Sequence, residues 1–126
     1  MDTMRAQLKG LYTIEMGDPS TFVPADPSKF VLYLRTMIGP EGEPGEESFD
    51  LTVCTPAWLQ GNLDPKEPLM GSGYLIVRDF DYARIKQRII RFISTCSGET
   101  WDAIACKLGR LGNWEFEDYR EYEDAP

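Results

Sequence analysis

Residues 30–59 read FVLYLRTMIGPEGEPGEESFDLTVCTPAWL and contain two strand-like segments, the loop between them and a helical turn. Residues 30–38 are apolar on nearly both faces and in part β-branched or aromatic, which indicates a strand in the interior of a sheet. Residues 48–56 alternate, with Phe49, Leu51 and Val53 on one face and polar residues or a cysteine on the other. The loop is rich in glycine, proline and glutamate, so the stretch predicts a hairpin with a long tip, and PAWL predicts a helical turn begun by proline.

Two further strands are expected outside this hairpin. Residues 8–16 alternate between apolar and polar positions with Leu11 as the one exception, which is typical of a half-buried strand. Residues 74–80, YLIVRDF, form the other, after a loop that contains two prolines and several glycines.

Two helices are predicted in the second half of the chain. Asp81 is placed to cap the first helix, and Thr100 is placed to cap the second, which we expect to end near Gly109. The buried stripes are Tyr82, Ile85, Ile89, Phe92 and Ile93 on the first helix, and Trp101, Ile104, Ala105 and Leu108 on the second. The order predicts an α+β fold: a mostly antiparallel sheet of about four to five strands, with these two helices packed on one face.

Size and charge limit the class of protein. A chain of 126 residues with 42% hydrophobic residues predicts one domain, residues 1–126. It carries 21 acidic and 13 basic residues, a net charge of -8, which disfavours nucleic acid as a partner and favours a basic protein.

Residues 1–16 lack the apolar core of a signal peptide and no apolar run could cross a membrane, so we expect a cytoplasmic protein. Three cysteines, Cys54, Cys96 and Cys106, are expected to be reduced, buried small hydrophobic residues.

No enzyme signature is found. The chain has no histidine, which removes the commonest general base and nearly every zinc site. Carboxylate pairs such as Glu46 and Glu47, or Glu117 and Asp118, could serve a glycosidase or bind Mg²⁺, but runs of like charge are more typical of a solvated surface. We therefore expect no catalytic residue, metal or cofactor, with a carboxylate enzyme as the less favoured alternative. The arginines 84, 88 and 91 are interpreted as the solvent side of a helix, and Trp58, Trp101 and Tyr82 as core.

Acidic residues gather in two short segments. Eleven of the 21 lie in residues 41–50 and 115–124, and the second segment is interleaved with aromatic residues of the kind favoured in protein interfaces. Trp114 and Phe116 are expected to pack inward from a strand-like edge, whereas loop 41–47 is expected to be exposed and unable to pair or pack. Solubility is the simpler explanation of the acids. The predicted partner-binding residues are Glu41, Glu43, Glu46, Glu47, Asp50, Glu115, Glu117, Asp118 and Tyr119.

Three segments carry a family resemblance: IGPEGEPGEESFDLTVCTPAWL, GSGYLIVRDFDYARI and TWDAIACKLGRLGNWEFEDYR. Together they resemble the immunity protein 8 family of bacterial polymorphic toxin systems, over residues 30–119. The resemblance implies a small α+β protein, encoded beside a secreted toxin, that stays in the cytoplasm and neutralises that cognate toxin by binding it. It supplies no toxin-contacting residues. The acidic charge suggests a toxin with a basic cleft, such as a nuclease; the rival interpretation is an acidic adaptor or regulator that docks a basic protein.

Overall fold

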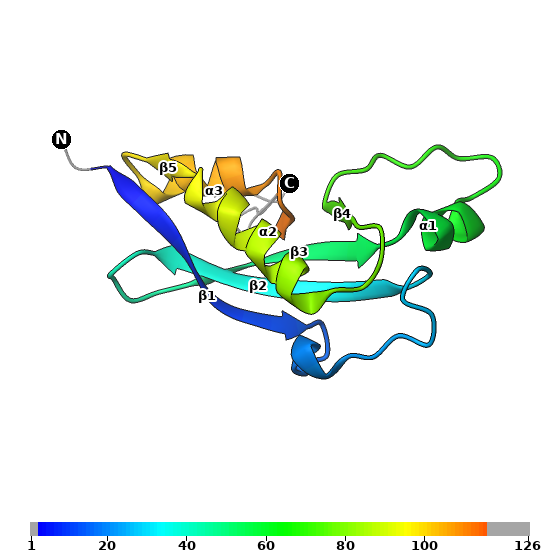
Figure 1. Ribbon diagram of the computed structural model, residues 1–126. Helices are drawn as coiled ribbons and strands as arrows, with labels where there is room; N and C mark the ends of the chain where they lie inside the picture. Colours follow the sequence, from blue (N-terminus) through cyan, green and yellow to red (C-terminus); the bar gives the residue numbers. More distant parts are fainter. Residues whose placement is uncertain (1–2, 116–126) are drawn as a thin grey trace.

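A mixed sheet with helices on one side forms the protein, whose computed structural model describes residues 3–115 (Figure 1). The strand order is β4-β3-β2-β1-β5, and β6 also pairs with β3. The elements are β1 (Met4–Thr13), the 3-10 helix η1 (Pro19–Thr21), β2 (Val31–Pro40), β3 (Glu47–Cys54), α1 (Pro56–Asn62), β4 (Tyr74–Ile76), α2 (Tyr82–Ser94), β5 (Ser97–Gly98), α3 (Trp101–Leu108) and β6 (Asn113–Trp114). The predicted α+β class is confirmed, and the predicted helical turn is the start of α1.

The predicted hairpin is the centre of the sheet. Strands β2 and β3 pair antiparallel from Val31 opposite Cys54 to Ile38 opposite Glu47. This register puts Leu32, Leu34 and Thr36 of β2 opposite Val53, Leu51 and Phe49 of β3, and all six side chains are buried. The buried Thr36 hydroxyl donates to the Phe49 carbonyl oxygen at 2.7 Å, so its polar group is satisfied inside the core.

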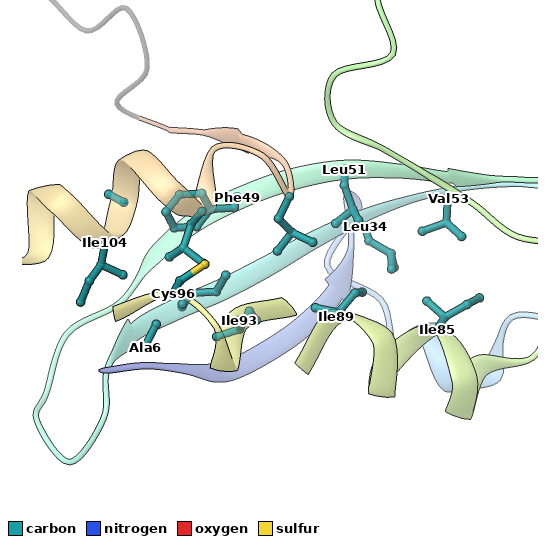
Figure 2. Packing of buried hydrophobic residues seen from close by; sticks show 14 of the residues in the cluster. Ala6, Leu34, Phe49, Leu51, Val53, Ile85, Ile89, Ile93, Cys96 and Ile104 are labelled. Carbon is teal, nitrogen blue, oxygen red and sulfur yellow. The ribbon is translucent and has the colours of Figure 1, made fainter. Parts of the chain in front are cut away.

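Helices α2 and α3 cover the buried face of this hairpin. Ile85, Ile89 and Ile93 of α2 lie over the sheet, and Ile104 of α3 extends the same core (Figure 2). Each helix begins where the sequence predicts: the Asp81 carboxylate accepts from Arg84 N at 3.2 Å, and the Thr100 hydroxyl accepts from Ala103 N at 3.2 Å. Helix α3 ends at Leu108, and Gly109 caps it near the predicted end. Both helices therefore pack on one face, as predicted.

Strand β1 begins and ends earlier than the predicted 8–16. Its register with β2 shifts between Leu8 and Gly10, so that Leu8 and Leu11 both lie opposite residues of the helix-covered face. This β-bulge explains why Leu11 breaks the alternation of the sequence. The strand ends at Thr13 because a turn follows, in which Met16 N donates to Thr13 O at 2.8 Å.

Strand β4 is shorter than the predicted 74–80. Its three residues pair with Thr52–Cys54, where β3 ends, and the pairing is parallel because α1 and the loop after it carry the chain back to the start of this segment. Beyond Val77 the chain leaves the sheet, and Phe80 N donates to Pro27 O at 2.9 Å. The sheet is therefore mixed, although most of its pairings are antiparallel as predicted.

Three predictions about buried side chains are wrong. Trp58 and Tyr82 are half-buried and lie outside the core cluster, since α1 buries no residue and Tyr82 stands at the first position of α2. Cys106 is exposed because it lies on the outer side of α3. Cys54 and Cys96 are buried, and this burial raises the pKa of both thiols. Trp101 is half-buried but packs against the core.

Candidate functional site

The two acidic segments of the sequence meet at one end of the central hairpin. Strand β6 pairs antiparallel with β3, which sets Trp114 opposite Phe49 and Asn113 opposite Asp50. Ser48 N donates to the Glu115 carboxylate at 2.5 Å, and Glu115 N donates to Ser48 O at 3.0 Å. The fold thus joins the first residues of β3 to the beginning of the carboxy-terminal acidic segment.

The hairpin tip, residues 41–46, presents three carboxylates to solvent. Glu41, Glu43 and Glu46 are all exposed. The prediction of exposure is confirmed, but the expectation that the loop cannot pack is wrong: the Gly45 carbonyl oxygen lies where a Cβ of residue 39 would be, 1.9 Å from it, so only glycine fits at that position. Lys9, in the bulge of β1, donates to the carbonyl oxygens of Glu43 and Gly45. The tip is therefore a fixed turn with outward-facing acids.

Glu47 does not belong to this solvent-facing set. It shares the buried side of β3 with Phe49, and its Oε1 atom accepts from the indole nitrogens of Trp101 at 2.6 Å and Trp114 at 2.9 Å. One carboxylate therefore ties α3 and β6 to the end of the hairpin. The Trp114 ring in turn stacks on Phe49, with centroids 6.2 Å apart and planes 9° from parallel. We interpret Glu47 as a structural residue.

Asp50 is engaged in an ion pair on the other face of the sheet. Arg35 Nε and Nη2 donate to its two carboxylate oxygens, each at 2.8 Å, and both side chains are about one-third exposed, at 34%. The hydrogen bond and the charge of Asp50 raise the pKa of the Arg35 guanidinium, with a smaller contribution from the charge of Glu115. Asp50 is thus accessible but already paired.

Of the nine predicted partner-binding residues, four are exposed acids at this end of the sheet: Glu41, Glu43, Glu46 and Glu115. We call these four the acidic tip. In residues 3–115, none of these four carboxylates is in an ion pair. The predicted residues Glu117, Asp118 and Tyr119, and the inward packing predicted for Phe116, lie outside the described residues.

Comparison with known protein families identifies the family of the chain. The model of the family described as Immunity protein 8 matches residues 6–119, nearly the whole sequence. The chain belongs to the immunity protein 8 family. The match confirms the resemblance seen in the sequence and extends it to β1. No curated protein and no solved structure matches the chain.

The described part of this immunity protein 8 family member holds neither a metal cluster nor a membrane-spanning helix. Within residues 3–115, no group of three or more histidine, cysteine, aspartate or glutamate side chains is arranged to hold a metal ion. None of the helices in the same range is long and apolar enough to cross a bilayer.

Sequence reasoning missed the sheet face opposite α2 and α3, which we call the open face. It carries Tyr12, Tyr33, Arg35, Asp50 and Thr52, which the register sets in two adjacent rows, and neither α2 nor α3 covers it (Figure 1). Tyr33 is 51% exposed. The signal was the alternation of Tyr33 and Arg35 with buried leucines in β2, which the apolar Val31 and Met37 at the same phase obscured. Strand β2 is interior within the sheet, but among residues 3–115 the two long helices cover only one of its faces.

Proposed function

We propose that this chain neutralises a cognate secreted toxin by binding to it, without turnover, in the cytoplasm of the toxin-producing cell. Membership of the immunity protein 8 family supports a toxin as the partner. The proposed binding through an acidic surface is supported by the acidic tip, where pairing of β6 with β3 joins two acidic segments that are far apart in the sequence.

The acidic tip favours a basic surface on the toxin. Exposed like charges at one end of an acidic protein attract an oppositely charged partner and raise its association rate. A toxin that cleaves RNA or DNA needs such a basic surface for its substrate, so an acidic inhibitor would compete for the same field. We therefore propose a nuclease as the class of toxin. Lys9 and the exposed Arg5 lie beside the tip, at Glu43 and Glu41 respectively, and offset part of its charge.

Co-expression with the toxin tests the function. The carboxy-terminal toxin domain encoded beside the gene should arrest growth when produced alone, and the chain should restore growth and co-purify with the toxin domain in a stable complex. An unrelated acidic protein of similar size and charge serves as the control and should restore nothing. Growth arrest that persists while the chain accumulates in folded form, with no complex recovered, rejects an immunity function and favours the adaptor interpretation.

Removing charge from the acidic tip should slow association. We expect Glu43→Gln/Glu46→Gln to reduce the association rate with the toxin domain several-fold at low salt and to flatten its salt dependence, whereas the dissociation rate changes less. Adding Glu41→Gln should enlarge the effect. The melting temperature should stay close to that of the parent because exposed charges contribute little to stability. Stopped-flow binding at two ionic strengths measures this.

The matched control removes two exposed acids elsewhere, as Glu67→Gln/Asp79→Asn. It changes the net charge equally, so it separates local steering from the effect of total charge. Equal rates for the two pairs would contradict a role for the tip. Glu47 is left unchanged in every variant, because its carboxylate holds two tryptophans.

A further inference from the structure

A pocket opens on the open face of the sheet. Its volume is about 430 Å³, and it lies where β4 and β6 follow one another along the outer edge of β3. The residues that matter most in its lining are Glu15, Tyr33, Asp50, Thr52, Tyr74 and Asn113. Tyr33, Thr52 and Tyr74 form one row across β2, β3 and β4, so their side chains share the open face.

The lining combines carboxylates, polar oxygens and aromatic rings, which are groups that bind a planar cation. Two carboxylates, Glu15 and Asp50, lie at the pocket, and no lysine or arginine is among its lining residues. Arg35 already donates to both carboxylate oxygens of Asp50, so Glu15 is the carboxylate left for a ligand: it is exposed and has no hydrogen bond or ion pair with any residue in 3–115. Two tyrosine rings supply faces on which a cation can stack, and the Thr52 hydroxyl and the Asn113 amide supply further acceptors.

We propose that this pocket, which we call the Tyr33 pocket, receives an arginine side chain of the toxin and anchors the complex. The proposal rests on the proposed function, since it names the chemistry by which the partner is held. A guanidinium satisfies the site better than an ammonium, because it stacks on tyrosine and presents several donors in one plane to carboxylate, hydroxyl and amide oxygens.

Two other observations favour an arginine from a basic protein. Asn113 lies in β6 directly before Trp114 and Glu115, so the Tyr33 pocket and the acidic tip share one continuous strand edge. A basic surface steered by the tip would therefore meet the pocket next. The exposed Tyr33, at 51%, and the pocket beside it also match the usual hot spot, in which an aromatic or arginine residue fills a pocket.

Binding of pocket variants to the toxin domain tests the proposal. We expect Tyr33→Ala to weaken affinity roughly thirtyfold, mainly through faster dissociation, as is usual for a hot spot. Glu15→Gln should weaken it several-fold and does not depend on sheet packing, because Glu15 lies in the turn after β1. Tyr33→Phe should retain most of the affinity, since the stacking face remains. The control is Ile90→Ala, a residue that is 43% exposed on α2, which should bind as the parent does.

A double-mutant cycle identifies the occupant. Each arginine of the toxin domain is changed to alanine and paired with Tyr33→Ala, and one of them should show strong coupling that its change to lysine only partly retains. If the parent binds the toxin but Tyr33→Ala and Glu15→Gln bind equally well, the pocket assignment is wrong and the proposed function stands. If the parent itself neither binds nor protects, the function fails and the pocket assignment with it. Self-association of the free chain that Tyr33→Ala abolishes would show a second copy as the occupant and would also overturn the assignment.

Discussion

Phe49→Ala is expected to lower the free energy of unfolding by about 3–5 kcal/mol, the usual cost of deleting a buried large aromatic ring. Phe49 is fully buried at 0% exposure, lies opposite Thr36 at the centre of the hairpin and stacks on Trp114. Loss of the ring would leave a cavity under α3 and remove the packing partner of β6. Such a loss is a large share of the roughly 5–15 kcal/mol that stabilises a typical domain. Urea unfolding followed by circular dichroism measures the change.

The control for this variant is Met70→Ala. Met70 is 86% exposed in the loop after α1, and its truncation should shift stability by less than about 0.5 kcal/mol. Unfolding of Phe49→Ala at the same urea concentration as the parent would contradict the packing shown in Figure 2.

Glu47→Ala is the second large effect, with an expected loss of roughly 1.5–3 kcal/mol. Its Oε1 atom accepts both indole N–H groups, so its removal leaves two half-buried donors without their acceptor. Glu47→Gln should cost much less, because an amide oxygen has two lone pairs and can accept both bonds. Urea unfolding monitored by tryptophan fluorescence reports both stability and the environment of the two rings.

The neighbouring Glu46 provides a matched control, since Glu46→Ala removes the same carboxylate from an exposed position. It should be neutral within about 0.5 kcal/mol. Trp101→Phe and Trp114→Phe each remove one indole N–H and retain most of the ring, and in the Glu47→Ala background neither should add a further loss from that bond. Equal destabilisation by Glu46→Ala and Glu47→Ala would show that the bridge contributes nothing.

Adjacent acidic residues at the start of β3 have different roles. Glu46 and Glu47 are adjacent and chemically identical, yet one faces solvent in the acidic tip and the other bridges two tryptophans. Alternation along β3 decides this, because Glu47 has the same phase as Phe49 and Leu51. An interface variant that includes Glu47 would therefore lose stability as well as charge, and its failure to bind would be misread.

The sequence by itself determined the local elements and the identity of the family. The hairpin, both long helices and their caps followed from the spacing of apolar residues and from Asp81 and Thr100, because periodicity and capping are properties of neighbouring residues. The ordered motifs of residues 30–119 pointed to the immunity protein 8 family, which the family match confirmed. Leu11, the one exception to the alternation of β1, marked the β-bulge in the sequence, but only the register with β2 identified it as a bulge.

Tertiary structure alone decided which acids are exposed and where the pocket on the open face lies. Pairing of β6 with β3 brings Glu115 to Ser48 across 67 positions of the chain, and no local pattern encodes such a contact. The parallel pairing of β4 depends on the path of α1 and the loop after it, whereas the tryptophan contacts of Glu47 and the exposure of Cys106 depend on how α3 and β6 pack. The Tyr33 pocket is built from five separate segments. Long-range pairing fixes these features because it places distant residues within reach, whereas a sequence pattern reports only the neighbours of each residue along the chain.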